Sequence, residues 1–339
     1  MSSSEAVSVG MDLGSSCSAI CTSDGSIRSL RSVVGWPADG DADKFSAADA
    51  VVGEAALERR SLLDLCWPLA DGLETASEGR AARALHQLLV ELLRADPRAE
   101  MGPPVHAVVG LPSGTVEGEI ARLRQCFSGL VDSLLLVSAP LALAYGIDAL
   151  ESALIIDIGA RSSDLVLMLG RYPTIDDRHT LPSGGNAIDA ALQQEVAQKY
   201  PDLNVSLETA RRWKEHHGFV GVRAQRIVVA EPCGDQPRTL DITDQLRLSC
   251  EGLLDPLADA MLQVLEECPL EKQSAVLRNI ILTGGSSQIR GLASQLEAVL
   301  RDRGGRVRRI KDPTFVAPLG GLSLAADLSE EDWQQLSIN

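Results

Sequence analysis

The sequence is poor in aromatic residues. Its 339 residues include 4 Trp, 3 Tyr and 4 Phe, which is 3% of the chain. Because open grooves for sugars and nucleobases use aromatic side chains as stacking platforms, this scarcity argues against both binding classes. The core must then be aliphatic, and at 45% hydrophobic residues the chain can bury a large one.

Basic residues are also in short supply. The chain has 31 Lys and Arg against 47 Asp and Glu, and therefore a formal net charge of −16. Because an acidic surface repels phosphate backbones, we expect no nucleic-acid partner. The same charge opposes anionic headgroups, so we expect no direct membrane binding.

Long apolar runs are missing as well. The longest apolar stretch without a charged residue covers residues 133–147 and contains Pro140, so it is shorter than the ~20 residues that span a bilayer. Residues 1–9 contain no basic region and no long apolar segment, and we therefore expect neither a signal peptide nor a membrane anchor. These features predict a cytoplasmic protein.

The cysteines follow no metal or redox pattern. Seven cysteines include no CxxC pair and no histidine at metal-binding spacing. Because an odd number cannot pair completely within one chain, we interpret them as reduced, mostly buried, small hydrophobic residues.

Three glycine-containing turns each follow a short apolar run. They cover residues 9–16, 154–164 and 280–287. The first two share the order apolar residues, Asp, aliphatic residue, Gly and then small hydroxyl residues, which is typical of two copies of one strand–turn–strand unit. We therefore expect two related halves that meet near residue 151.

The remaining pattern alternates strands and helices. Apolar residues recur at helical spacing over residues 85–93, 120–130, 254–268 and 289–299, and buried strands are predicted over 106–111 and 279–283. This alternation predicts an α/β architecture. Polar and turn-forming segments predict one small insertion over about 33–66 and a second over about 189–250.

The first glycine turn has the composition of a phosphate site. Gly14, Ser15 and Ser16 allow backbone N–H groups to approach phosphate oxygens. Asp12 ends the strand, where a carboxylate can hold the water shell of Mg²⁺. The alternative is an ordinary β-turn with Asp12 as a local cap.

The other two turns favour the phosphate interpretation. The segment that starts at Asp157 repeats the chemistry of the first turn, and two facing turns would clamp a polyphosphate. The third turn, residues 283–286, offers a bare backbone surface for an adenine ring.

The three turns, in this order, resemble the phosphate-one, phosphate-two and adenosine motifs of the actin, heat-shock-chaperone and sugar-kinase superfamily. Within it the chain is most similar to the bacterial actins that organise magnetosome chains, and the likeness covers nearly the whole sequence. It extends to loops that a generic actin fold does not dictate, namely residues 32–37, 137–140, 213–221 and 311–315.

The resemblance implies an actin-like ATPase fold with two duplicated halves that flank a nucleotide cleft, each with a small inserted subdomain. Residues 1–150 would form the first half and 151–318 the second, and 319–339 would return to the first half as helices. Residues 139–146 and 318–325 resemble the two helices that cross between the halves.

The resemblance also implies the ligands. ATP and Mg²⁺ would be the cofactors, with Asp12 and Asp157 holding the ion through water and Asp157 in the catalytic role. The nucleotide-binding residues that it implies are Gly14, Ser15, Ser16, Gly159, Ala160, Arg161, Ser162, Lys214, Gly284, Gly285 and Ser286.

Four positions depart from the family pattern. Ala139 stands where a Glu polarises the attacking water, and Arg161 where the second phosphate turn has a glycine. Either Arg161 reaches the γ-phosphate, or a strained backbone is tolerated there. Ser286 replaces a third glycine, and Arg211 replaces a Glu that binds ribose in many relatives.

These features predict an ATP-binding protein that polymerises into cytoplasmic, cytoskeletal filaments along magnetosome chains, with weak hydrolysis of ATP to ADP and phosphate. The expected partners are copies of itself, an intact paralogue of the same family and an acidic or magnetosome adaptor protein. A chaperone domain is disfavoured by the chain length, and a sugar kinase by the lack of a catalytic Asp motif. The remaining alternative is a regulator of this superfamily docked on a membrane complex of the pilus or division type.

Overall fold

The computed structural model describes residues 6–38, 49–70, 79–93, 103–112, 115, 117–223, 225–233 and 236–338. The chain divides into two compact units, residues 1–149 with 312–339 and residues 150–311, and each is described by itself.

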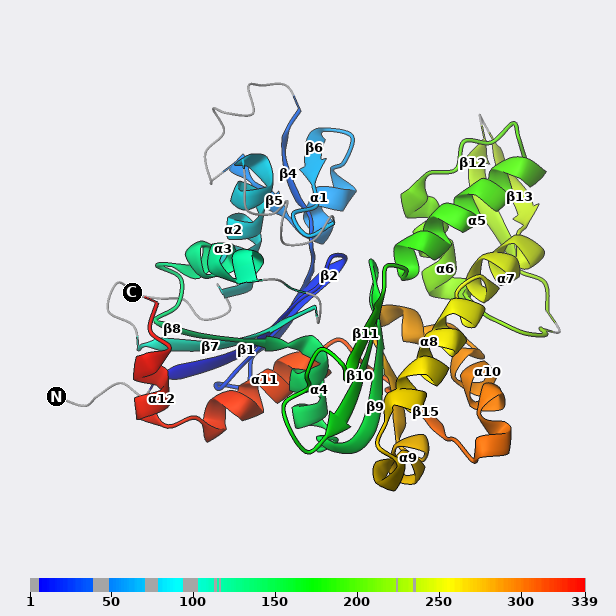
Figure 1. The fold of residues 1–339 in the computed structure, drawn as a ribbon. Coiled ribbons are helices and arrows are strands. Elements are labelled where there is room, and N and C mark those ends of the chain that lie inside the picture. The colour runs from blue at the N-terminus through cyan, green and yellow to red at the C-terminus, as the bar shows by residue number, and fades with distance from the viewer. Residues whose placement is uncertain are drawn as a thin grey trace. The chain divides into compact units, whose positions relative to one another are not determined.

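Five strands form the sheet of the first unit (Figure 1). In sheet order they are β3 (Ile27–Arg31), β2 (Cys17–Thr22), β1 (Val7–Leu13), β7 (Val105–Leu111) and β8 (Ser133–Ser138). β1, β2 and β3 are antiparallel neighbours, whereas β7 and β8 run parallel to β1. The carboxyl ends of β1, β7 and β8 therefore meet at one edge of the sheet, where ligands bind in open α/β sheets.

Two helices cover one face of this sheet. They are α2 (Gly79–Leu93) and α3 (Glu117–Phe127), both at positions predicted by apolar periodicity. Val9, Met11 and Leu13 of β1 share a core with the leucines of α2 and with Phe127. Burying each such aliphatic side chain contributes about 1.5–3 kcal/mol, so this face anchors the unit.

On the other face of β1, the backbone of a helix packs directly against the backbone of the strand. A Cβ at Gly10 would lie 1.9 Å from the carbonyl oxygen of Pro318, so α11 (Val316–Asp327) lies directly on the strand. α4 (Ala139–Gly146) crosses α11 just as closely, since a Cβ at Gly320 would lie 1.7 Å from the carbonyl oxygen of Ala142. Both helices predicted at 139–146 and 318–325 are thus present, and glycines set how near they approach.

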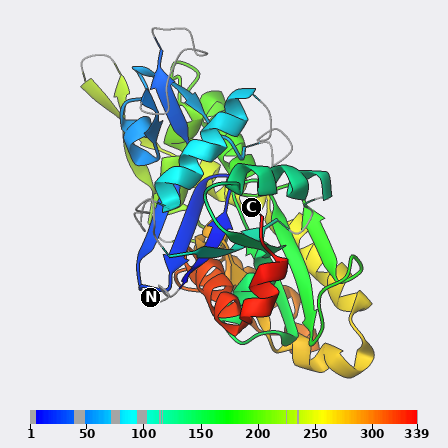
Figure 2. The ribbon, with the colours of Figure 1, turned by 90° about the vertical axis from the view of Figure 1, so that its left-hand side faces the viewer.

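The C-terminal segment ends on the sheet edge (Figure 2). α12 (Glu330–Gln335) begins with a capping box between Ser329 and Asp332. Its buried Trp333 lies 4.6 Å, centroid to centroid, from the ring of His106 on β7. Beyond the helix, the N–H of Leu134 on β8 donates to the carbonyl oxygen of Leu336 at 3.1 Å.

A small subdomain is inserted after β3. Its sheet has the order β5 (Val51–Val52), β4 (Val34–Pro37) and β6 (Leu63–Cys66). Helix α1 (Glu54–Glu58) lies between β5 and β6 along the chain. Val33, Ala56 and Leu57 form its own core. Residues 39–48, within the insertion predicted over about 33–66, lie outside the described residues.

The second unit repeats the sheet of the first. Its strands, in sheet order, are β11 (Arg178–Leu181), β10 (Ser163–Leu169), β9 (Glu151–Ile158), β14 (Ile280–Thr283) and β15 (Val307–Arg309). β9, β10 and β11 are antiparallel neighbours, and β14 and β15 run parallel to β9. Strand order and direction match the first unit one for one, which confirms the predicted duplication.

Aliphatic side chains of β9 and β10 face the core of the second unit. Leu154, Ile156 and Ile158 pack with helices that follow the second insertion. These are α8 (Leu254–Glu267), α9 (Leu270–Leu277) and α10 (Leu292–Val299), with short 3₁₀ turns η3 (Gly285–Gln288) and η4 (Arg301–Arg303) around α10. The intervening residues of β9, which include Asp157, point to the opposite face.

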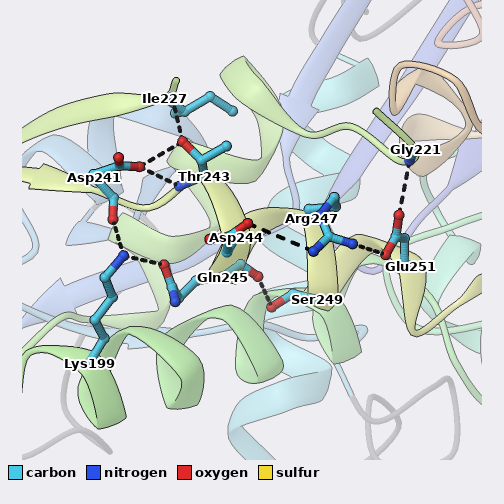
Figure 3. A network of polar contacts seen from close by, with 10 residues as sticks. All are labelled: Lys199, Gly221, Ile227, Asp241, Thr243, Asp244, Gln245, Arg247, Ser249 and Glu251. Atoms are coloured by element: carbon cyan, nitrogen blue, oxygen red, sulfur yellow. Dashed lines mark hydrogen bonds and ion pairs between the residues drawn. The ribbon is translucent and has the colours of Figure 1, made fainter. Parts of the chain in front are cut away.

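The second insertion contains three helices and a hairpin. They are α5 (Gly185–Lys199), α6 (Leu207–His217), β12 (Val228–Cys233), β13 (Gln236–Asp241) and α7 (Thr243–Glu251). A polar network fixes the start of α7 (Figure 3). Asp241 accepts hydrogen bonds from the backbone and hydroxyl of Thr243 at 3.1 and 2.7 Å, and Lys199 donates to the Asp241 carbonyl at 2.8 Å. The Thr243 hydrogen bonds, the largest contribution, lower the pKa of Asp241.

Among the described residues, no helix is both long and apolar enough to cross a membrane. Six cysteines are free thiols, of which Cys21, Cys250 and Cys268 are buried and Cys17, Cys66 and Cys126 are half-buried.

Candidate nucleotide-binding site

The two predicted phosphate turns occupy equivalent places in the two sheets. Asp12 pairs with Ala19 across β1 and β2, and Asp157 pairs with Asp164 across β9 and β10. In each unit the turn starts two residues after the aspartate. Each aspartate therefore lies just below its turn, at the carboxyl end of a central strand, where backbone N–H groups can face a ligand.

Buried hydroxyl groups hold the first turn. The hydroxyl of Ser32 donates to the carbonyl oxygen of Gly14 at 2.6 Å, and the Ser18 hydroxyl lies 2.9 Å from that of Ser32. Both serines are fully buried. A Cβ at Gly14 would lie 2.4 Å from the turn's own backbone, so only glycine fits without a shift. The turn is thus fixed from beneath, whereas Ser15 and Ser16 above it are only half-buried.

Asp12 lies beside Gly110 and Ala139. A Cβ at Gly110 would lie 3.3 Å from the Cα of Ala139 and 3.6 Å from Oδ1 of Asp12. The three residues come from β1, β7 and the first position of α4. Desolvation raises the pKa of Asp12 to about 6, because burial disfavours the charged form of a carboxyl group. Ala139 supplies only a methyl group, which cannot polarise water.

The second turn packs on the start of α5. The N–H of Gly185 donates to the Gly159 carbonyl at 3.0 Å, and the N–H of Asn186 donates to the Ala160 carbonyl at 2.7 Å. A Cβ at Gly184 would lie 2.6 Å from the Gly159 carbonyl oxygen. The Gly184–Gly185 pair therefore lets the helix approach the turn at backbone distance.

The backbone of Arg161 is not strained. Among the described non-glycine residues, only Asp148 and Ser152 have positive φ. The strain predicted as one alternative for Arg161 is therefore wrong, because this turn is built without a left-handed residue there. Its side chain is exposed, and Ser162 behind it closes the turn by accepting a hydrogen bond from the N–H of Gly159 at 2.9 Å.

The third turn packs against the second. Gly284 has φ +83°, and a Cβ there would lie 2.4 Å from both Oδ1 of Asp157 and the carbonyl oxygen of Ile158. The Ser286 hydroxyl donates to the carbonyl oxygen of Gly159 at 3.3 Å. A Cβ at Gly285, in contrast, would meet nothing within 4 Å. This glycine therefore leaves an open backbone surface of the kind that an adenine ring needs.

A buried ion pair supports this surface. Nζ of Lys214 lies 2.7 Å from Oδ1 of Asp189 and donates to the carbonyl oxygen of Gly185 at 2.8 Å. Arg211 pairs with the other oxygen of Asp189 at 3.3 Å. Asp189 is 2% exposed and Lys214 8%. Removing Asp189 would leave Lys214 as an uncompensated buried charge, which is strongly destabilising.

The residues predicted for the second half are thus brought together within one unit: Asp157, Gly159, Ala160, Ser162, Lys214, Gly284, Gly285 and Ser286. Those of the first half, Asp12 and Gly14 to Ser16, lie together in the other unit. Sequence reasoning missed Gly184 and Asp189, although a glycine pair directly before an amphipathic helix was visible. It also missed Asp164, which only the strand register places beside Asp157.

The described residues contain no group of three or more His, Cys, Asp or Glu side chains arranged to hold a metal ion. Asp12 at the first phosphate turn and Asp157 at the second do fit Mg²⁺, since this ion keeps several of its waters and binds through one or two carboxylates plus substrate phosphates.

A sheet duplicated in this strand order, with a glycine turn after the same strand in each copy and a third turn packed on the second, defines an actin-like protein. The family model described as MreB/Mbl protein matches residues 6–327. The chain belongs to this family of bacterial actins.

Curated relatives narrow the comparison. The actin-like protein MamK of Magnetospirillum gryphiswaldense is 35% identical over 97% of this chain and 91% of its own length. MamK of Paramagnetospirillum magneticum is 34% identical over 97% and 94%. A MamK-like protein of the same organism is 33% identical over 97% of both chains. The chain is therefore a MamK-type actin.

Solved structures of MamK are also similar to this structure. The MamK double helical filament matches with a TM-score of 0.88 and 33% identity, over 96% of this chain and all of that one. A non-polymerising MamK mutant bound to AMPPNP matches with a TM-score of 0.74 over the same shares.

Proposed function

We propose that this protein binds ATP with Mg²⁺ at its two phosphate turns and its adenosine turn, and polymerises into cytoskeletal filaments. The observation that carries the proposal is the equivalence of the two turns. The sheets repeat strand for strand, and each copy places one aspartate below a glycine turn. The fold itself does not require a carboxylate at the same place in both sheets. A site that binds a polyphosphate with a hydrated cation does use such carboxylates, because they hold the waters of the cation.

Self-association is the proposed assembly. MamK forms a double helical filament, and this chain is similar to it over nearly its whole length. Head-to-tail contacts between identical subunits grow without limit when the rotation does not close a ring. We place the filaments in the cytoplasm along magnetosome chains, with an adaptor protein as the link, because the curated relatives are MamK proteins.

Asp12 and Asp157 are the residues proposed to hold Mg²⁺ through water. The bound ion would neutralise charge on the phosphates during hydrolysis. The desolvated Asp12 carboxyl becomes more readily ionised when a cation is near. Gly14, Ser15 and Ser16, with Gly159 to Ser162, would supply the N–H groups that face the phosphates, and Lys214 with Gly284 to Ser286 the surface for adenosine.

Hydrolysis is proposed to be slow. Ala139 occupies the start of α4 beside Asp12, and a methyl group can neither accept a proton nor orient water. A general base typically contributes ~10²- to 10⁴-fold to the rate. Positioning and charge neutralisation remain, so a weak ATPase is expected.

Sedimentation with Mg·ATP tests the proposal. The Asp12→Ala and Asp157→Ala variants should each bind a fluorescent ATP analogue more weakly and pellet less than the natural protein. Asp259→Ala removes an exposed carboxylate on α8 and serves as the matched control. Unchanged nucleotide binding and pelleting in both site variants would refute the assigned site.

The same sedimentation assay, repeated with lipid vesicles, distinguishes the filament-forming protein from the alternative, a regulator docked on a membrane complex. A protein of that class would not pellet with Mg·ATP alone but would do so together with vesicles and a membrane partner. Filaments that form without lipid support the cytoskeletal assignment.

A further inference from the structure

Arg211 on α6 connects that helix to the start of α5, within the second unit. Its Nε donates to Oδ2 of Asp189 at 3.3 Å. Its two terminal nitrogens donate to Oδ1 of Asn186 and to Oε2 of Glu208, each at 3.4 Å. Only 18% of the Arg211 side chain and 2% of the Asp189 side chain are exposed. The guanidinium is therefore fixed between two helices, and it in turn fixes the carboxylate of Glu208.

The start of α5, which Arg211 contacts, joins the second phosphate turn to the adenosine turn. The N–H of Asn186 donates to the carbonyl oxygen of Ala160, in the phosphate turn, at 2.7 Å. A Cβ at the preceding residue, Gly185, would lie 2.6 Å from the hydroxyl oxygen of Ser286, in the adenosine turn. Because the ribose of ATP connects the adenine to the phosphates, a nucleotide that uses both turns places its ribose near this segment.

The hydroxyl groups of a ribose need hydrogen-bond acceptors, and Glu208 is the side chain of this cluster that is suited to supply them. Arg211 carries donors only, and the amide oxygen of Asn186 already accepts from Arg211. Glu208 lies one helical turn before Arg211, and 42% of its side chain is exposed. A carboxylate has about four acceptor positions, of which the contact with Arg211 uses one. Its exposed part can therefore receive the hydroxyl groups of a ligand.

We propose that Glu208 determines specificity for the ribose of the nucleotide, by accepting hydrogen bonds from the 2′- and 3′-hydroxyl groups. The inference rests on the proposed binding of ATP. Arg211 is a positioning residue, because its contacts are with protein groups and it acts through the carboxylate that it holds. A nucleotide without the two hydroxyl groups leaves this carboxylate without its donors, and a site built to bind a hydroxyl group discriminates against such an analogue.

The test compares ATP with 2′,3′-dideoxyATP, which lacks both hydroxyl groups but keeps the base and the phosphates. Isothermal titration calorimetry with Mg²⁺ uses both nucleotides unlabelled, so that no dye on the ribose blocks the contact. The natural protein should bind ATP at least about tenfold more tightly, because hydrogen bonds to a charged group are the stronger kind. In Glu208→Ala the two affinities should agree within about twofold, since ATP binds more weakly and the dideoxy nucleotide binds as before.

Two more variants separate recognition of ribose from a structural role. Arg211→Lys keeps the positive charge but loses the planar fork of donors, so the ratio of the two affinities should fall about threefold. Glu267→Ala removes an exposed carboxylate from α8 of the same unit and is the matched control, with an unchanged ratio. Glu208 also lies in the first turn of α6, where an acidic residue stabilises a helix. A merely structural role would lower both affinities equally.

The outcomes are separable from those of the proposed function. Equal affinities for the two nucleotides in the natural protein, or an unchanged ratio in Glu208→Ala, would overturn the role of Glu208 and leave the binding of ATP intact. If thermal unfolding shows that Glu208→Ala does not fold, an unchanged ratio in Arg211→Lys would overturn it instead. A natural protein that binds neither nucleotide would refute the proposed function itself.

Discussion

At the scale of single residues, we expect position 139 to limit the rate of ATP hydrolysis by this actin. Its methyl group lies beside Gly110 and Asp12, at the edge where a phosphate ligand is expected. The Ala139→Glu variant should therefore release phosphate faster than the natural protein, by about 10²-fold. That change equals about 2.7 kcal/mol of activation free energy. The measurement is steady-state phosphate release under polymerising conditions.

Arg161→Gly is the companion variant. The Arg161 backbone has no positive φ, so glycine relieves no strain and should not stabilise the fold. If the exposed guanidinium reaches the γ-phosphate, Arg161→Gly lowers phosphate release and ATP affinity. If the natural protein already hydrolyses as fast as Ala139→Glu, the interpretation of a weakened catalytic site is wrong.

Asp12 carries a stability cost, which its proposed role at the Mg²⁺ site would explain. Its folded pKa of about 6 lies above the ordinary 3.8, so the folded state holds the proton to higher pH than the unfolded chain. Stability that is present below pH 3.8 is therefore lost as the pH rises through 6. The difference corresponds to at most about 3 kcal/mol. Asp12→Asn should raise the melting temperature of the nucleotide-free protein by a few degrees at pH 7.5 and by much less near pH 4.

Asp24→Asn is a control of opposite sign. Hydrogen bonds from Thr22 and Ser26 lower the pKa of Asp24, so this variant should lose stability relative to the natural protein as the pH rises. Thermal unfolding at both pH values tests both variants. An Asp12→Asn protein less stable than the natural one at pH 7.5 would contradict the desolvation argument.

At the scale of elements, the crossing of α4 and α11 sets the geometry around Ala139. Gly320→Ala would place a Cβ 1.7 Å from the carbonyl oxygen of Ala142. The helices must separate or the backbone must shift, so we expect a loss of about 3 kcal/mol or more of unfolding free energy, at the upper end for overpacking. Denaturant unfolding measures it.

Gly118→Ala provides the matched helical control. Gly118 lies within α3, where a Cβ would meet nothing within 4 Å. Alanine should stabilise this helix by about 0.5–1 kcal/mol through its higher propensity. A tolerated Gly320→Ala variant would show that the close crossing does not hold in solution.

The strands and helices were largely predictable because their signals are local. Apolar periodicity predicted α2, α3, α8 and α10, the family resemblance predicted the two crossing helices, and the repeated Asp–aliphatic–Gly pattern predicted the duplication. Pairings between distant segments were not predictable. The register that joins Asp157 on β9 to Thr283 on β14 arises from strands more than a hundred residues apart along the chain, and no single-sequence pattern specifies it.

The site was predicted in parts for the same reason. Glycine turns can be predicted from the composition of a short segment, so Gly14, Gly159 and Gly284 were predicted. The supports were not, because the buried serines under the first turn and Asp189 under Lys214 are defined only by tertiary packing. Arg161 shows the converse error, since a residue type alone did not reveal its backbone conformation.

At the scale of the whole molecule, the net charge of −16 predicts that purified protein does not bind lipid. Like charges repel anionic headgroups, and each basic residue that would offset this contributes only about 1 kcal/mol at a membrane surface. Co-flotation with vesicles that contain anionic lipid measures it, with neutral vesicles as the control. Protein that floats with anionic vesicles in the absence of any partner would contradict the prediction.

The last prediction concerns filament lifetime. If subunits leave the filament only after ATP hydrolysis, a rate lowered 10²- to 10⁴-fold leaves most subunits in the ATP state, and filaments of this protein should persist after dilution. Filaments of Ala139→Glu should shorten sooner, because restored hydrolysis produces ADP subunits. The measurement is the decay of light scattering after dilution of filaments preformed with Mg·ATP.

A mixed-filament assay extends this prediction to partners. MamK is about a third identical to this chain, and its filament matches the structure over 96% of the chain. Labelled MamK should therefore co-assemble with this protein, and its exchange should slow as the fraction of this protein rises. The Ala139→Glu variant should slow it less at equal fraction. Equal decay of natural and variant filaments, together with unchanged MamK exchange, would show that hydrolysis at this site does not set filament lifetime.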